Sequence, residues 1–502
     1  MDGIDGDGGG SAMSAAGENV NGAPGGAAGR ESWSERVETV DWGALAPDRG
    51  KEIPVLLRDL ADGGAASGND PVESLATLHD ILRFPEPGYL AAPTAVEFLT
   101  AIACDPATAP AGRWRPLSLL LELIVPHAAT RFPHHRDIAL WRDEVAWVSA
   151  TPVDEARAQY ETWLGEASDE QEHRRLTRRL DTLSRDNGPA LIEAELAVHD
   201  AARERVADLA GLLAGSDNRR SVDSAAEWAC YVLAFFPDEA ETILPVLTRE
   251  SSLLVPRDLA SGATSGDGPL SAELFAVGML ARPEHAAVTV ALAHQMAGGH
   301  LYNTFTAAVS LAMIHGERVP QECLRRITRS GRSRVGYKGL FDDSWPYCGQ
   351  HPPEQLGYLA LGRGGTATRG VRIDMLPEVL AAAEGASRAI LVADALEMVL
   401  GPRDEGHDPA DHESAEFTQD TLRVLWAIAE LDEAAWEAPG FVDTLEAWAL
   451  PTDRDAFREF AGVADDESAE PERDTSARDA PEANTGGGSR EQGGLLRRIF
   501  GG

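Results

Sequence analysis

Apolar residues recur at spacings of three and four along most of this chain, and this periodicity constrains the fold more than any other feature. Asn187, Gly188 and Pro189 form a helix start signal, because proline suits the first helical turn. A single apolar stripe follows, with charged residues on the other faces, and Gly215 ends it. The stripe predicts one amphipathic helix that buries the following residues: Leu191, Ala194, Val198, Ala202, Val206, Leu209 and Leu213.

A helix–turn–helix rhythm punctuated by proline recurs along the chain. Segments 224–234 (SAAEWACYVLA) and 271–281 (SAELFAVGMLA) resemble each other, and segments 306–313 and 389–396 look like further copies. The first two are separated by close to the roughly 40–47 residues of HEAT and armadillo repeats. No series of alternating β-branched strands accompanies them. We therefore predict an all-α fold, an α-solenoid of stacked HEAT/armadillo-like helix pairs. An irregular helical bundle is the alternative.

Composition changes at both ends of the predicted helical region. Residues 1–30 are rich in Gly and Ala, and residues 465–494 are an acidic mixture of Glu, Asp, Gly, Ser and Arg. Such segments bury too little apolar surface to offset the entropy of ordering, so we predict both to be disordered. A short apolar-basic tail, residues 495–502, follows the acidic linker. The predicted helical repeat domain therefore spans residues 31–464.

The 502-residue chain has a formal net charge of −38. Such a field repels polyanions, which argues against nucleic acid as the default partner. We find no basic and apolar targeting segment at the start, and no apolar run near the ~18–20 residues that span a bilayer. Four widely spaced cysteines form no disulfide framework. We therefore expect a cytoplasmic protein that does not insert into a membrane.

Several packing motifs resemble those of a known group of proteins. Segments 40–45 (VDWGAL), 53–57 (IPVLL) and 91–99 (AAPTAVEFL) resemble the opening of uncharacterised HEAT-repeat proteins common in actinobacteria. Segments 197–201 (AVHDA) and 231–240 (YVLAFFPDEA) resemble the middle of the same proteins. Segment 83–88 (RFPEPG) departs from the His-containing turn that these proteins often have. The resemblance covers roughly residues 40–320 and implies a HEAT-like fold, but it brings no active site and no function.

Three short motifs approach known chemical sites, and each lacks a required part. Gly362–Ala367 fits a G-x-G-x-x-A dinucleotide fingerprint, but residues 354–361 before it continue a helical pattern where the fingerprint needs a strand. Segment 331–338 resembles a P-loop, but its lysine comes one residue late. Cys348 and His351 lack the second ligand pair of a structural zinc site. We therefore predict no catalytic residue, no cofactor and no metal, with an enzyme site assembled across repeats as the weaker alternative.

Basic clusters are the unusual feature of so acidic a chain. The first candidate surface consists of Arg325, Arg326, Arg329, Arg332, Arg334 and Lys338. The second consists of Arg174, Arg175, Arg178 and Arg179. Guanidinium groups bind carboxylates and phosphates, so both clusters predict a site for an acidic peptide, a phosphate or a nucleic acid backbone. The alternative is that these arginines pair with nearby acids: Asp169, Glu170, Glu172 and Glu322.

The C-terminal tail is a third candidate surface, made of Leu495, Leu496, Arg497, Arg498, Ile499 and Phe500. Two apolar pairs around two arginines are typical of a docking peptide or a weak peripheral membrane contact; a solvated tail is the alternative. Stacked helix pairs also present an extended surface for recognition. We therefore predict a non-catalytic protein-binding scaffold or adaptor, which includes immunity-type masking of a basic partner. The alternative is a nucleic-acid-binding HEAT-like solenoid that uses segment 325–338.

Overall fold

The computed structural model confirms the all-α class predicted from the apolar periodicity. Within the residues it describes, all regular structure is helical and there is no strand. Segments 1–30, 465–494 and 495–502, for which we predicted disorder or a docking tail, lie outside these residues. The described ranges are 32–65, 67–109, 112–125, 137–167, 170–214, 225–250, 271–298, 301–332, 353–401, 417–438 and 440–463.

The chain divides into two units, Met1–Val40 and Asp41–Gly502. In the first unit, the described residues form helix α1 (Trp33–Arg36) and the 3-10 helix η1 (Val37–Thr39). The Glu35 carboxylate accepts a 3.1 Å hydrogen bond from the backbone N–H of Ser32. This contact is half of a capping box, and it accounts for the start of α1 at this serine.

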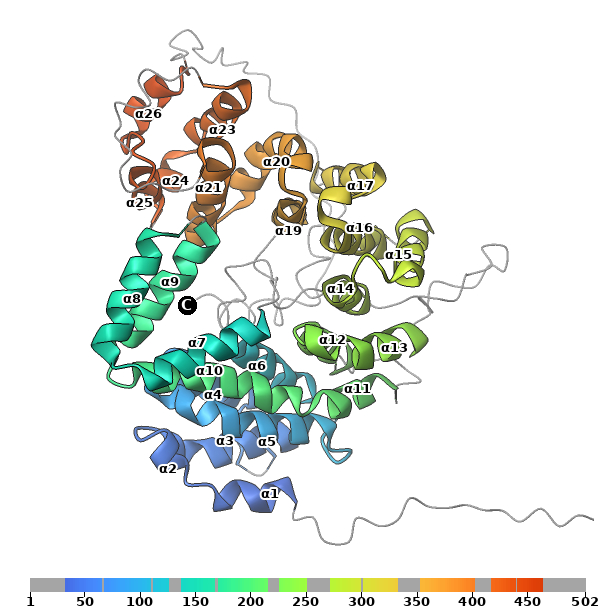
Figure 1. Ribbon diagram of the computed structural model, residues 1–502. Coiled ribbons are helices and arrows are strands. Elements are labelled where there is room, and N and C mark those ends of the chain that lie inside the picture. The colour runs from blue at the N-terminus through green and yellow to red at the C-terminus, as the bar shows by residue number, and fades with distance from the viewer. Residues whose placement is uncertain are drawn as a thin grey trace, which may run out of the picture. The chain divides into compact units, whose positions relative to one another are not determined.

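The second unit begins with paired helices. Their bounds are α2 (Trp42–Leu45), η2 (Gly50–Glu52), α3 (Ile53–Asp62), α4 (Pro71–Leu82), η3 (Pro87–Ala91), α5 (Ala92–Cys104), α6 (Trp114–Ile124), α7 (Ile138–Ala150), α8 (Val153–Gly165), α9 (Glu170–Leu183) and α10 (Gly188–Arg203). Helix α3 packs against α4, α5 against α6, and α8 against α9. Helix α10 contacts α5, α6, α7 and α9, so the core of this region forms around it (Figure 1).

The helices after α10 pack mainly against helices adjacent or next but one in the chain, although α11 also contacts α5 and α12 also contacts α6. They are α11 (Val206–Ala214), α12 (Ala225–Leu233), η6 (Pro237–Glu239), α13 (Ala240–Glu250), α14 (Ser271–Leu280), α15 (Ala286–Gly298), α16 (Leu301–His315), η7 (Gly316–Arg318) and α17 (Gln321–Arg332). Helix α11 contacts α12 and α13. Helix α14 lies between α12 and α16, and α16 also contacts α15 and α17 (Figure 1). Two segments were predicted to be helical repeats: α14 covers all but the last residue of 271–281, and 306–313 lies in α16.

The last described helices continue this neighbour-to-neighbour packing. They are α19 (Pro353–Leu361), η9 (Gly362–Ala367), α20 (Arg369–Ala382), α21 (Gly385–Leu400), α23 (Gln419–Ala429), α24 (Glu433–Trp436), α25 (Phe441–Glu446) and α26 (Arg454–Phe460). Helix α19 contacts α17 and α20, and α20 contacts α21 and α23. Helix α21 packs on α25, and α23 on α26.

Short polar side chains define where many of these helices begin. At the start of α7, Asp137 Oδ1 accepts hydrogen bonds from the backbone N–H groups of Ala139 and Leu140, at 3.0 and 3.1 Å. These bonds satisfy N–H groups that have no partner inside the helix. Asp41, Asp70, Thr418, Asp432 and Asp453 cap α2, α4, α23, α24 and α26 in the same way.

The single helix predicted from Asn187 to Gly215 is wrong, because the structure divides it into α10 and α11. The chain turns at Glu204 and Arg205, where the Arg205 N–H bonds to the carbonyl of Ala202, three residues back, at 3.0 Å. Ala202 and Val206 remain buried on either side of this turn. The apolar stripe therefore keeps its spacing across the break, and periodicity alone does not reveal it.

Candidate partner-binding surfaces

Helix α9, which carries the second arginine cluster, is positioned by a narrow apolar stripe. Leu176 and Leu183 are buried and Leu180 is partly buried, so the three leucines share one side of the helix. They pack with residues of α7, α8 and α10: Trp141, Val145, Val148, Ala156, Tyr160 and Ile192. The four arginines occupy positions i, i+1, i+4 and i+5, which distributes them as two pairs over two other sides of the helix.

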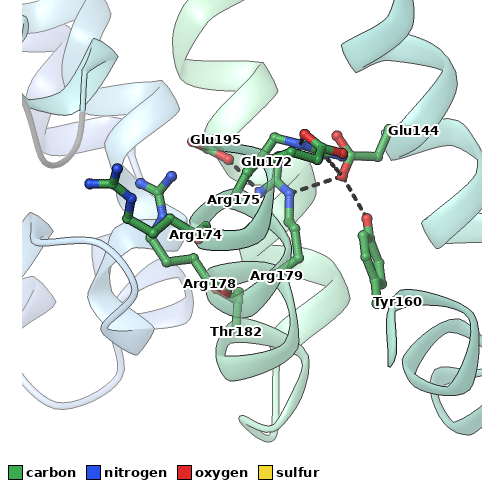
Figure 2. Close-up of polar contacts among 9 residues, drawn as sticks. All are labelled: Glu144, Tyr160, Glu172, Arg174, Arg175, Arg178, Arg179, Thr182 and Glu195. Carbon is green, nitrogen blue, oxygen red and sulfur yellow. Dashed lines mark hydrogen bonds and ion pairs between the residues drawn. The ribbon is translucent and has the colours of Figure 1, made fainter. Parts of the chain in front are cut away.

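The pair Arg175 and Arg179 belongs to an ion-pair network that joins three helices (Figure 2). Arg179 Nη1 lies 2.6 Å from Glu195 Oε2 of α10, and its Nε lies 3.2 Å from Glu144 Oε1 of α7. Arg175 lies 2.8 Å from the same Glu144 oxygen and 2.7 Å from Glu172. Only 7% of the Arg179 side chain is exposed, so this guanidinium cross-links α7, α9 and α10 inside the protein.

The Glu144 carboxylate is the centre of this network. Its Oε1 accepts from Arg175, from Arg179 and from the hydroxyl of Tyr160, the last at 2.7 Å. Burial would raise the pKa of Glu144, but the charges of Arg179 and Arg175 outweigh burial and hold this pKa below its ordinary value. Burial, together with the adjacent Glu144 charge, raises the pKa of Tyr160 far above its ordinary value. The phenol therefore stays protonated and keeps donating.

The pair Arg174 and Arg178 points away from Glu144 and Tyr160 (Figure 2). Both side chains are partly buried, and Arg178 Nε donates a 3.1 Å hydrogen bond to the backbone carbonyl of Arg174. The partner-binding role of the second cluster stays a prediction. Within this cluster, the side chains of Arg174 and Arg178 point away from the ion-pair network around Glu144.

Helix α17 carries the described part of the first cluster. Its buried side consists of Cys323, Leu324 and Ile327. Arg325 and Arg329 are exposed on the other side, with Arg326 partly exposed. Glu322 lies 2.9 Å from Arg325 and 3.1 Å from Arg326. Because 63% of the Arg325 side chain is exposed, its pair with Glu322 contributes at most about 1 kcal/mol, and an acidic ligand can compete for this guanidinium.

The remaining members of the predicted surfaces lie at or beyond the edge of the described residues. Arg332 is the last residue of α17. Arg334 and Lys338 lie outside the described residues, as does the tail from Leu495 to Phe500. A common groove for the two arginine clusters, and docking by the tail, both stay predictions.

The residues before the glycine motif at 362–367 are helical, as predicted, and form α19. The motif itself is the 3-10 helix η9, in which Gly365 has φ 50°. Gly364 packs against Thr368, whose hydroxyl donates a 2.6 Å hydrogen bond to the Leu361 carbonyl. These glycines therefore form a tight turn between two helices, which is not the strand–turn–helix unit that holds a dinucleotide.

Other reactive groups of the described ranges are buried or isolated. Burial raises the pKa of the Cys104 thiol to about 11 and that of Cys323 to about 12, so both are protonated and poorly nucleophilic at neutral pH. No three His, Cys, Asp or Glu side chains converge as metal ligands in this part of the chain. No helix there is long and apolar enough to cross a membrane.

Sequence reasoning did not identify Glu144, Tyr160 and Glu195 as partners of the arginines. Among the acids close to the cluster in sequence, Glu172 pairs with Arg175. A signal for the others was present, because Arg179 lies three residues after Leu176 and therefore on the flank of the apolar stripe. An arginine at such a position is buried only if acids from neighbouring helices meet it.

No family model, no curated protein and no solved structure matches this chain. The kinship with actinobacterial HEAT-repeat proteins therefore stays a prediction. The structure itself defines the broader class: an all-helical protein whose described helices pack against one another.

Proposed function

We propose that this chain is a non-catalytic scaffold whose HEAT-like helix pairs form an α-solenoid and bind a protein partner. The observation that supports the proposal is the series of contacts α12–α14–α16–α17–α19–α20, in which each helix packs on the next. Packing between neighbours in sequence is the pattern of repeat arrays, and such arrays offer extended surfaces to partners. The packing of α5, α6, α7 and α9 on α10 is the less regular part of the array.

In this proposal the exposed arginines of α17 bind acidic groups of the partner. Arg325 and Arg329 are displayed on the side opposite Cys323 and Ile327, and Glu322 pairs with Arg325 and Arg326. A partner carboxylate that binds two guanidinium groups gains charge-assisted hydrogen bonds, whereas the exposed pair with Glu322 costs little to lose. Arg174 and Arg178, whose side chains point away from Glu144, are proposed as a second contact surface.

The proposal is tested by purifying the tagged full-length chain from its own host at low and high salt and identifying what accompanies it. We expect one protein in near-equal amount, which then binds the purified chain in titration calorimetry. Replacing Arg325, Arg326 and Arg329 by Ser is expected to weaken that binding at least tenfold, or about 1.4 kcal/mol.

The matched control replaces three exposed arginines elsewhere, Arg157, Arg282 and Arg318, by Ser, which removes the same charge. This control is expected to retain binding. Equal losses in both triple variants would show that net charge alone, and not the α17 surface, governs the interaction. Recovery of nucleic acid that high salt removes would replace the protein-scaffold proposal with a nucleic-acid-binding one. Recovery of neither would refute both.

A further inference from the structure

His199, on α10, is a buried imidazole with no hydrogen bond among the described residues. It is 3% exposed, and neither Nδ1 nor Nε2 has a hydrogen-bonding partner there. Its ring meets the edge of Trp141 of α7 at a centroid distance of 5.5 Å, and Phe236, next to η6, at 5.1 Å. Buried polar atoms are almost always paired, so an imidazole enclosed by two apolar rings is an exception that calls for a reason.

The nearest acceptor is the carboxylate of the next residue, Asp200. Its Oδ1 lies 3.6 Å from His199 Nδ1, too far for a well-formed hydrogen bond. Asp200 is instead bound by Arg142 of α7, which donates to both carboxylate oxygens, at 3.0 Å between Nη1 and Oδ2. This bidentate pair connects α7 to α10 directly beside the imidazole.

Several other charged groups around α10 form ion pairs. On the η6 side, Arg203 lies 2.8 Å from Asp238 and 2.8 Å from Glu239. Elsewhere on the elements packed against α10, the pairs are Glu97 of α5 with Arg205, Glu122 of α6 with His79, Arg179 of α9 with Glu195, and Glu86 beside η3 with Arg185. Asp238 and Asp200 are the acids whose charge acts on His199, and Asp200 has an oxygen 3.6 Å from its ring.

We propose that His199 is an acid-sensitive switch at the contact between α7 and α10. When neutral, the ring fits between Trp141 and Phe236. When a proton from solvent binds, both ring nitrogens become donors and the ring carries a charge that its apolar surroundings do not solvate. The imidazolium attracts the Asp200 carboxylate and repels the Arg142 guanidinium, so the Arg142–Asp200 pair weakens and α7 loosens from α10.

The surroundings of His199 also disfavour its charged form. Burial lowers the pKa of His199 from its ordinary value, and the negative charges of Asp238 and Asp200 offset burial only in part. A histidine whose pKa is lower in the folded state costs stability as the pH falls below its unfolded pKa of about 6.5, and the cost levels off below the folded pKa. Between these two pKa values, the equilibrium constant for opening the contact between α7 and α10 increases by up to about tenfold for each unit by which the pH falls.

A loosened α7 would act on the arginine helix α9. Glu144 of α7 binds Arg175 and Arg179, so its displacement would release part of their charge toward ligands. This consequence for partner binding rests on the proposed function, whereas the switch between α7 and α10 does not.

The test is hydrogen exchange, read by mass spectrometry, over residues 138–150 of the full-length chain at pH 7.5 and 5.5. Protection factors are corrected for the pH dependence of intrinsic exchange. In the wild type we expect protection of α7 to fall about tenfold at the lower pH. In His199→Phe, which cannot titrate and keeps a ring between Trp141 and Phe236, we expect a change of less than about twofold.

His199→Gln provides a second non-titrating variant if the phenylalanine disturbs folding. His294→Gln, at an exposed position of α15, is the matched control that should retain the wild-type response. An equal fall in protection in the wild type and the His199 variants would overturn the proposal, as would constant protection in the wild type. The readout requires no partner, so its failure is distinguishable from failure of the proposed function.

Discussion

A single guanidinium, that of Arg179, neutralises two carboxylates from different helices. Removing it would take the 2.6 Å partner of the buried Glu195 carboxylate, whereas Glu144 would keep its ion pair with Arg175. Removing one partner of a buried ion pair costs about 3–5 kcal/mol, because the remaining charge is left without compensation. We therefore expect Arg179→Ala to lower the free energy of unfolding by about that amount, measured by urea denaturation.

Arg178→Ala is the matched control for this substitution, since it removes the same type of side chain at the adjacent position of α9. Its guanidinium points away from Glu144 and bonds to a backbone carbonyl of its own helix. We expect Arg178→Ala to lower the free energy of unfolding by less than about 1 kcal/mol. Similar losses for the two variants would contradict the assignment of Arg179 as the internal cross-link.

The contribution of His79 to stability changes with pH in the opposite direction to that of His199. Its Nε2 lies 2.7 Å from Glu122 Oε2. Burial would lower the pKa of His79, but its hydrogen bond and charge interaction with Glu122 outweigh burial and raise it. The stabilisation is therefore complete below the unfolded pKa of about 6.5 and is lost as the pH rises through the raised folded pKa. We expect His79→Gln to cost about 1–2 kcal/mol at pH 6 and clearly less at pH 9, by urea denaturation at both values. A cost independent of pH would mean that the imidazole is neutral in the fold.

At the scale of elements, the close contact of α14 and α16 depends on small residues. A Cβ added at Gly278 would lie 2.5 Å from Ser310 Cβ, and the Ser310 hydroxyl already bonds to the Leu274 carbonyl at 2.9 Å. We expect Gly278→Ala to destabilise the protein by about 1–3 kcal/mol through overpacking, although alanine is ordinarily the better helix former. Thermal unfolding checks this, with Gly211→Ala of α11, which has open space, as the control expected to be neutral or stabilising. A stabilising Gly278→Ala would show that the two helices separate at little cost.

The apolar periodicity was enough to predict helices, but it did not predict their ends or partners. Segments 224–234 and 271–281 were predicted from their similarity, and α12 and α14 lie within them. The turn between α10 and α11 was missed because Ala202 and Val206 keep helical spacing across it. The network around Glu144 was missed for a different reason. Glu144 and Glu195 are distant from Arg179 in sequence, and only the packing of α7, α9 and α10 brings them together.

At the scale of the whole molecule, acidic charge acts in two ways. Many arginines form pairs between elements, such as Arg203 with Asp238 at 2.8 Å and Arg205 with Glu97 at 3.4 Å. Yet 82 acidic residues exceed 44 basic ones, so nearly half of the carboxylates are in excess of the basic residues that could pair with them, and the excess negative charges repel one another. The pairs act over a few ångströms, whereas the repulsion accumulates over the dimensions of the fold.

Added salt separates these two effects because it screens long distances first. The Debye length falls from about 30 Å at 0.01 M to about 10 Å at 0.1 M, which removes much of the repulsion but leaves contacts near 3 Å almost unscreened. We therefore expect the Tm to rise by about 2–4 °C between these concentrations of sodium chloride, measured by calorimetry. Tetramethylammonium chloride is the control, since its bulky cation screens charge without coordinating carboxylates. A fall in Tm would mean that the ion pairs between helices outweigh the repulsion. A Tm that rises in sodium chloride but not in tetramethylammonium chloride would point to bound cations and not to screening.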